Sequence, residues 1–383
     1  MAARFDYIAL QRQWARLAVG PYAAATVLSA LLAVRWHHRA ARRPLRARTV
    51  LALAVLTGAL LVPLALEVAW RARHGDRLHI QSEVFLTEEG ARALLHGSDP
   101  YSASYRYGLL RSYPSAVWRH IPYLPAVFAF GLPRALLGPG PLTDARVGFT
   151  AVAVTAALLA LALCRASGAQ RLRALTVLLA LPTGARYLTG GGDDIAVLGL
   201  LVLTMVLEHR RRPMAAGVAA GLAAAIKQTA WLPLPFLALA ARDQAGRRAT
   251  WRFLAAAALV VVPVVAPFAV WDLHTLLDSV VLFPLGLTSE PTTARGLTLG
   301  QLLATPFPHA KGVTAVVLAG VVVGVGLLLA VKRPPASARD AARHASIVLG
   351  LAILLAPAGR FGYLIYPTNL LVWSRVLPQP SNS

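Results

Sequence analysis

Long apolar runs recur along this chain, and they restrict its fold more than any other feature. Hydrophobic residues make up 57% of its 383 residues and charged residues only 14%. Runs of about 18–22 residues, such as residues 49–70, can each cross a hydrocarbon layer roughly 30 Å thick as a helix. Lipid satisfies no backbone hydrogen bond, so such apolar segments cross it as helices. We therefore predict an all-α, polytopic transmembrane bundle that forms a single integral membrane domain over residues 1–383.

The chain carries a formal charge of +22, and its arginines gather in the short gaps between apolar runs. This distribution is the positive-inside pattern, which retains such gaps in the cytoplasm. A nucleic-acid-binding protein would need a basic domain with aromatic stacking positions, and the sequence has none. Nucleic acid is therefore excluded as a partner. The main clusters are Arg35, Arg39, Arg42, Arg43, Arg46 and Arg48; Arg210, Arg211 and Arg212; and Arg242, Arg247, Arg248 and Arg252.

With these clusters inside, the apolar runs predict about eleven crossings, within a range of roughly 9–12. Residues 121–137 are apolar but interrupted by prolines, and we treat them as re-entrant or interfacial. Two long extracytoplasmic loops follow, residues 71–146 and 272–312, of which the first is the longer and carries surface or re-entrant helices. The expected spans are residues 17–34, 50–70, 147–164, 174–189, 195–207, 213–226, 229–241, 253–271, 313–331, 345–357 and 361–374.

Acidic residues are concentrated on the predicted outer side. Eleven of the sixteen acids fall there, although acids contribute little to the orientation rule. Their bias is therefore unexplained by insertion and is compatible with an external active site. The eleven are Asp76, Glu83, Glu88, Glu89, Asp99, Asp144, Asp193, Asp194, Asp272, Asp278 and Glu290.

The stretch 79–101, just after an early span, holds three of these acids within the seven residues 83–89. We predict a helix over residues 83–96, with Ser82 as a possible N-cap and Gly97 as the stop. Its apolar face is expected to rest on the membrane surface. The glutamates either complement the positive helix N-terminus, worth about 0.3–1 kcal/mol, or include a general base. The expected apolar face comprises Val84, Ala91, Leu94 and Leu95.

The run LLHGSDPY at residues 94–101 resembles glycosyltransferase family 87 of the GT-C superfamily. The family pattern has an aspartate upstream of the Asp-Pro-Tyr aspartate, and in this chain Glu83 stands at that position. The resemblance implies that Glu83 is the catalytic base, with Asp76 as the alternative. It also implies that Asp99 and Tyr101 contribute to substrate binding.

Three later stretches carry the same resemblance: GGGDD at 190–194, AGVAAGLAAAIKQ at 216–228 and RFGYLIYP at 360–367. The resemblance implies substrate-binding roles for Asp194, Lys227, Arg360 and Tyr363. Arg295 is a second candidate, beside Arg360, to join Lys227 in holding a donor phosphate.

Several of these residues also have plainer interpretations. Lys227 either holds a phosphate or extends its ammonium to the membrane interface. Asp193 and Asp194 form at most a partial cation site, and a solvated turn is favoured; no metal site is predicted. Gly217 and Gly221 form a G-xxx-G pair, which favours helix packing over chemistry.

The resemblance implies a membrane hexosyltransferase that needs no cofactor or metal. Its donor would be a polyprenyl-phosphate sugar, with mannose as the implied sugar, and its acceptor an extracytoplasmic lipid or glycan. The expected location is the plasma membrane, with the site on the extracytoplasmic face in contact with membrane lipids. The alternative is a multi-span transporter or flippase for a lipid-linked or polar solute, because short, Gly/Pro-interrupted segments also suit transport helices. The sequence shows no paired halves, and its long acidic loop favours the enzyme.

Overall fold

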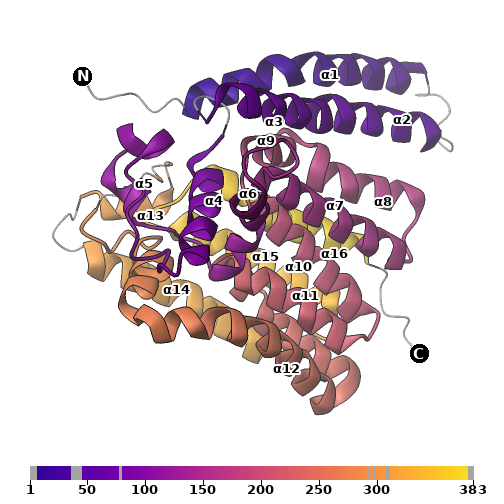
Figure 1. Cartoon of the computed structure of the whole chain (residues 1–383). Helices are drawn as coiled ribbons and strands as arrows, with labels where there is room; N and C mark the ends of the chain where they lie inside the picture. The colour runs from indigo at the N-terminus through magenta and orange to yellow at the C-terminus, as the bar shows by residue number, and fades with distance from the viewer. Residues whose placement is uncertain are drawn as a thin grey trace.

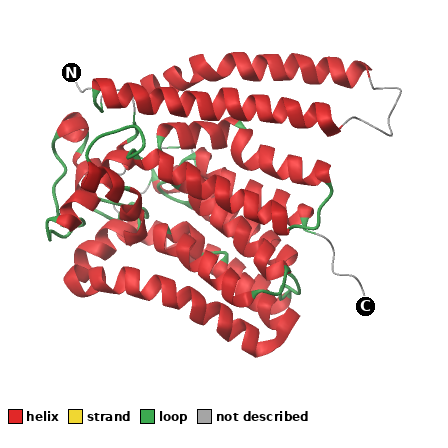
Figure 2. Cartoon of the chain, turned by 45° about the vertical axis from the view of Figure 1, so that its right-hand side comes forward, coloured by secondary structure: helices red, strands yellow, loops and turns green. Residues whose placement is uncertain are grey.

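A computed structural model describes residues 7–35, 45–76, 80–290, 294, 296, 298–306 and 311–377. Those residues form helices and connecting loops with no β-strand, as Figures 1 and 2 show, which confirms the all-α prediction. The helices up to residue 163 are α1 (Tyr7–Arg35), α2 (Leu45–Leu56), η1 (Thr57–Leu61), α3 (Val62–His74), α4 (Ser82–Leu95), η2 (Gly108–Ser112), α5 (Ser115–Arg119), η3 (Pro125–Phe130), α6 (Leu132–Leu137) and α7 (Ala145–Leu163). The later helices are α8 (Gly168–Leu175), η4 (Thr176–Ala180), α9 (Pro182–Gly190), α10 (Asp194–His209), α11 (Pro213–Ile226), η5 (Gln228–Trp231), α12 (Leu234–Leu277), η6 (Asp278–Leu282), α13 (Leu299–Ala304), α14 (Lys311–Lys332), α15 (Ala338–Leu355), η8 (Phe361–Leu364) and α16 (Ile365–Val376).

Within the described ranges, five helical stretches are long and apolar enough to cross a membrane: Leu10–Arg35, Leu45–His74, Ala145–Leu163, Gln228–Leu282 and Gly312–Lys332. The fourth stretch is not one continuous helix, because Ala245 and Gly246, and again Asp272, leave the helical conformation. The chain is therefore a multi-pass membrane protein. Shorter apolar helices such as α10 and α11 lie between these stretches, and the count of about eleven crossings stays a prediction.

The expected span at 174–189 is interrupted. Leu181 is extended, with ψ 151°, between the end of η4 and the start of α9. Pro182 follows it, and a proline disfavours helical conformation in the residue before it while fitting the first turn of a new helix. The expected segment therefore consists of two helices, of which the second begins at Pro182.

Helix α10 forms the centre of the bundle, and nearly all its side chains are buried. It packs against α7 and α11, and α11 packs in turn against α12. A Cβ atom on Gly217 would lie 2.2 Å from the Phe253 carbonyl oxygen, and one on Gly221 would lie 2.7 Å from that of Ala257. Only glycine permits this approach of two backbones, so the predicted packing role of the G-xxx-G pair is confirmed.

The two ends of the bundle differ in chemistry. At one end, Arg171 donates a hydrogen bond to the Cys164 carbonyl (2.7 Å), and the Cys164 thiol lies 3.9 Å from the Val376 carbonyl. This end holds the basic turns between α7 and α8 and between α10 and α11. At the opposite end, the Leu124 amide donates to the Ile226 carbonyl (2.9 Å). Helices α4, α5 and α13 gather there, toward the left of Figure 1.

Helix α4 matches the predicted helix within a residue at each end. Gln81, rather than Ser82, is its N-cap, and Gly97 follows it with φ +70°, a conformation that suits glycine at a helix stop. The expectation that one face rests on the membrane is wrong for most of the helix, because residues 84–91 are all buried. The preceding His79 lies outside the described residues. Residues 121–137 form the short helices η3 and α6, which pack on α4.

Candidate active site

Three consecutive glycines fix where α4 begins. The Gln81 amide donates a hydrogen bond to the Gly190 carbonyl (3.0 Å). Gly191 has φ +105°, and a Cβ atom there would lie 2.0 Å from Val84 Cγ2. A Cβ on Gly190 would lie 2.6 Å from the Gln81 side-chain nitrogen. Because Gly190 and Gly191 have no side chain, the first turn of α4 can rest directly on the α9–α10 turn. This contact places Glu83 beside the residues of that turn.

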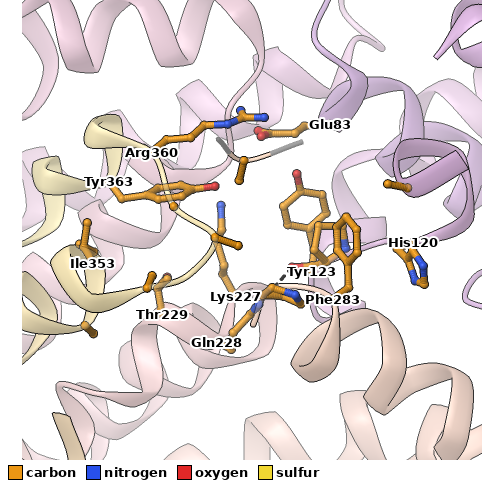
Figure 3. A pocket seen from close by; sticks show the side chains of 18 of the residues that line it. Glu83, His120, Tyr123, Lys227, Gln228, Thr229, Phe283, Ile353, Arg360 and Tyr363 are labelled. Atoms are coloured by element: carbon orange, nitrogen blue, oxygen red, sulfur yellow. Dashed lines mark hydrogen bonds between the residues drawn. The ribbon is translucent and has the colours of Figure 1, made fainter. Parts of the chain in front are cut away.

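A cavity of about 250 Å³ opens in front of Glu83. Its polar end is formed by residues far apart in the sequence, and Figure 3 shows their side chains converging: Glu83, Tyr123, Lys227, Arg360 and Tyr363. Glu83 and Arg360 point toward one another, with the Lys227 ammonium group and the two tyrosine hydroxyls beside them. Much of the remaining wall is apolar and comes from the turn between η5 and α12, from α15 and from the segment after η6, through Leu232, Phe283, Leu349, Ala352 and Ile353.

Lys227 is 5% exposed and is held by two carboxylates. Its Nζ lies 2.7 Å from Asp193 Oδ1 and 2.7 Å from Asp194 Oδ1. The Tyr366 hydroxyl donates to Asp194 Oδ1 (2.8 Å), and the Tyr123 ring lies 5.1 Å from the ammonium group. The extension of Lys227 to the membrane interface is therefore wrong. The solvated turn at Asp193 and Asp194 is wrong too, because each is 1% exposed and paired with Lys227.

No group of three or more His, Cys, Asp or Glu side chains suited to a metal ion occurs among the described residues. Asp193 and Asp194, the pair considered in the sequence as a partial cation site, both bind Lys227 instead. This pairing gives the two aspartates a structural role in holding the ammonium group at the cavity.

Two carboxylates at this site, Asp193 and Glu83, have a buried oxygen without a hydrogen-bond partner among the described residues, and of the two Glu83 is the one that lines the cavity. Its Oε2 atom is buried and has no hydrogen-bond partner among the described residues. Burial raises the pKa of Glu83 above the ordinary 4.5, and Asp194 acts in the same direction. Lys227, Arg360 and a hydrogen bond from Tyr123 oppose that rise. A partly desolvated carboxylate of this kind is suited to accept a proton.

Asp76, the alternative base, lies elsewhere. Its Oδ1 accepts a hydrogen bond from Arg71 Nε (2.8 Å), and it is not among the residues that line the cavity. Arg71 also donates to Glu88 Oε1 (2.9 Å) and to Asp144 Oδ2 (2.8 Å). Asp76 therefore belongs to a set of ion pairs that we call the arginine–carboxylate cluster. Its members are Arg71, Asp76, Glu88, Arg134, Asp144 and Arg146.

Asp99 and Tyr101 stand behind the cavity wall. The Asp99 carboxylate accepts from the Tyr101 amide (3.0 Å), and the Tyr101 hydroxyl donates to the Tyr123 carbonyl (2.7 Å). Neither lines the cavity in front of Glu83, so their contact with it passes through Tyr123. Arg295 lies outside the described residues.

Sequence reasoning missed Tyr123, Tyr366 and the arginine–carboxylate cluster. Tyr366 lies in the stretch 360–367 that carries the family resemblance, and Tyr123 lies in the proline-interrupted segment 121–137. Neither tyrosine has a sequence feature of its own that indicates a role at the site. The sequence does indicate that Arg71 is paired, because it directly follows the apolar run 49–70 and ionisable groups at such positions usually have a partner. Its partners Glu88 and Asp144 are 17 and 73 residues away along the chain, and nothing local identifies them.

A family model described as glycosyltransferase family 87 matches residues 122–357, more than half of the chain. The match includes Asp194 and Lys227 and leaves Glu83 and Arg360 outside it. No curated protein matches the sequence. Among solved structures, that of ArnT from Cupriavidus metallidurans bound to undecaprenyl phosphate is similar, with a TM-score of 0.53 and 16% identity over 85% of this chain. The match covers 59% of the ArnT chain, less than two thirds, and it shows a shared fold.

Proposed function

This chain belongs to glycosyltransferase family 87, and on that basis we propose that it transfers a hexose from a polyprenyl-phosphate donor to an acceptor hydroxyl. One observation supports this most strongly. A buried carboxylate oxygen of Glu83 shares a cavity with Lys227 and Arg360, and much of the rest of that cavity is apolar. A lipid-phosphate sugar has the matching parts: an anionic phosphate, a reactive anomeric carbon and a hydrocarbon chain. ArnT, which shares the fold, was solved with a lipid phosphate.

In the proposed reaction, Glu83 accepts the proton of the acceptor hydroxyl. The acceptor oxygen forms a bond to the anomeric carbon as the bond from that carbon to the phosphate oxygen breaks. The electron pair of the broken bond leaves with the polyprenyl phosphate. Direct displacement inverts the configuration at the anomeric carbon.

Lys227 and Arg360 are proposed to hold the phosphate as it gains negative charge. An ammonium group has three donors, and within the described chain two of those on Lys227 are directed at Asp193 and Asp194. The third can bind a phosphate oxygen. The Arg360 guanidinium can bind a phosphate through two parallel hydrogen bonds. Fixed positive groups at a leaving phosphate stabilise the transition state without reorganising.

The arrangement of the bundle supports an extracytoplasmic site, and the plasma membrane is the proposed location. The turn after α7, which contains Arg165, and the turn after α10, which contains Arg210, Arg211 and Arg212, lie at the end of the bundle opposite to α4 and Glu83. If those turns are cytoplasmic, as the positive-inside rule requires, the cavity faces outward. Mannose is the first sugar to test, on the resemblance alone.

The proposal is tested with the full chain in proteoliposomes that contain a membrane glycolipid extract as acceptor. Labelled polyprenyl-phosphate mannose, polyprenyl-phosphate glucose and GDP-mannose are supplied in parallel. We expect label to move from a polyprenyl-phosphate sugar to a new glycoconjugate, with polyprenyl phosphate released and no turnover of GDP-mannose. Movement of intact donor across the bilayer without cleavage would instead establish the transporter and reject the proposal.

The acid limb of the pH profile should report Glu83. The base works only when deprotonated, so kcat/KM should fall as the pH falls through the Glu83 pKa, with a midpoint above 4.5. Arg360 lowers that pKa, so Arg360→Gln should move the midpoint to higher pH as well as weaken donor binding. A midpoint at or below 4.5, or a shift to lower pH in the variant, would argue against Glu83 as the base.

A further inference from the structure

A second cavity, of about 460 Å³, lies next to the first. His120 lines both of them. Residues 101–104 and 118–120 form one side, and Thr275, Asp278, Ser279, Ser289 and Glu290 form the other. Its wall is dominated by hydroxyl and charged side chains, in contrast to the largely apolar wall in front of Glu83. The two neighbouring cavities thus suit ligands of opposite chemistry.

The Glu290 carboxylate in this second cavity is already paired with protein side chains. Arg119 donates to its Oε1 (2.7 Å), the Ser289 hydroxyl donates to its Oε2 (3.0 Å), and His120 Nε2 lies 3.3 Å from the same atom. Partial burial opposes ionisation, but these hydrogen bonds together lower the pKa of Glu290 to about 2. Glu290 is therefore ionised and serves to hold Arg119 and His120 in place.

Asp278 is the acceptor that remains open. It lies 3.5 Å from His120 Nδ1, and 32% of its side chain is exposed. A carboxylate offers about four acceptor positions, so Asp278 can receive hydrogen bonds from neighbouring hydroxyl groups of a ligand. The exposed Ser102 and Ser104 hydroxyls also line the cavity. Ser102 donates to the Asp99 carbonyl (3.2 Å) and can accept from a ligand, whereas Ser104 can both donate and accept.

The charges on this cavity do not favour an anion. Two carboxylates, Asp278 and Glu290, face one arginine and one histidine, so there is no excess positive charge. A ligand rich in hydroxyl groups and without charge matches the lining best. We propose that this second cavity binds the neutral sugar end of the glycosyl acceptor, an inference that rests on the proposed transferase function.

The wall between the cavities shows how the acceptor reaches the base. The His120 ring stacks on Phe283 with centroids 4.6 Å apart and planes at 15°, and Figure 3 shows both at the edge of the first cavity. The acceptor sugar lies on the Asp278 side of this pair and presents one hydroxyl past His120 toward Glu83. The donor occupies the first cavity, so the two substrates meet at this wall.

Binding can be measured without turnover, by saturation-transfer NMR on the full chain in lipid nanodiscs. The probes are methyl α-mannopyranoside, methyl α-glucopyranoside and methyl β-galactopyranoside, with a methyl glucuronide as the charged counterpart. We expect saturation of at least one neutral glycoside and weaker saturation of the glucuronide. Asp278→Ala, which removes the open acceptor, and Ser104→Trp, which fills the cavity, should each abolish it. Asp243→Ala removes an exposed acid at the basic end of the bundle and should leave binding unchanged.

Kinetics then separate this inference from the proposed function. Loss of a hydrogen bond to a charged acceptor predicts a rise of about tenfold to a hundredfold in acceptor KM for Asp278→Ala, with donor KM within about twofold. Glu83→Gln should lose turnover yet keep glycoside binding. The acceptor site is rejected if Asp278→Ala and Ser104→Trp both still bind the glycoside, or if the wild type shows no saturation transfer to any neutral glycoside. Either result holds whether or not Glu83→Gln retains turnover. Full turnover by Glu83→Gln overturns the proposed mechanism and leaves the binding result standing.

Discussion

Replacing Glu83 by glutamine is expected to lower kcat for sugar transfer by about 100-fold to 10,000-fold, the usual contribution of a general base. Glutamine keeps the size and most hydrogen bonds of the side chain but cannot accept the acceptor proton. Lys227 keeps Asp193 and Asp194 as its partners when residue 83 is neutral, so the variant should retain its fold. The measurement is single-turnover transfer from labelled polyprenyl-phosphate sugar.

Two variants serve as controls for Glu83→Gln. Glu89→Gln alters a carboxylate on the same helix that binds Arg92 and the Tyr107 hydroxyl, away from the cavity, and should keep kcat near the wild-type value. Asp76→Asn tests the alternative base and should likewise retain kcat per folded molecule. Loss of kcat in Asp76→Asn with normal kcat in Glu83→Gln would reverse the assignment of the base.

Replacing Arg71 by glutamine is expected to lower the free energy of unfolding by about 3–5 kcal/mol, the usual cost of breaking a buried ion pair by removing one partner. The Arg71 side chain is 2% exposed, and the Glu88 and Asp144 side chains are 3% and 1% exposed. Without Arg71, the three carboxylates of the arginine–carboxylate cluster would share two arginines. Thermal unfolding in detergent and equilibrium unfolding in mixed micelles both measure the change.

Arg73→Gln is the matched control, because Arg73 lies two residues away on the exposed side of α3. It should change the unfolding free energy by less than about 0.5 kcal/mol. The double variant Arg71→Gln with Glu88→Gln should be less destabilised than the two single variants summed, since it removes both charges of one pair. Equal stability of Arg71→Gln and Arg73→Gln would show that the cluster contributes little to the fold.

The arginine–carboxylate cluster also holds in place α4, the helix that carries Glu83. Glu88 lies on α4 five residues after Glu83, and it is tied to α3 through Arg71 and to α7 through the Ala145 amide, which donates to Glu88 Oε1 (3.0 Å). Together with the contact of Gln81 on Gly190, these bonds fix the position of α4. The carboxylates that sequence inspection grouped together thus divide into one that faces the cavity, Glu83, and others that anchor its helix.

The sequence by itself determined the class of fold and the position of most helices. Apolar runs predict membrane helices because the lipid demands internal backbone hydrogen bonds, and that requirement is met within each segment. Local features were equally readable: Gly97 ends α4 in the left-handed conformation, and Gly217 and Gly221 allow α11 to approach α12. The choice of Glu83 over Asp76 came from a resemblance and remains a prediction that the geometry favours.

Only the tertiary structure decided which charges pair. Lys227 binds carboxylates 34 and 33 residues earlier in the chain, and Arg71 meets Asp144 at a separation of 73 residues. The three glutamates of α4 looked alike in sequence because each is a carboxylate on an outer helix. Their environments differ because α4 is buried between η3, α6 and α7 rather than lying on the membrane. The length of an apolar run is a local property of the chain. The partner of a buried charge depends instead on which distant segments are packed beside it.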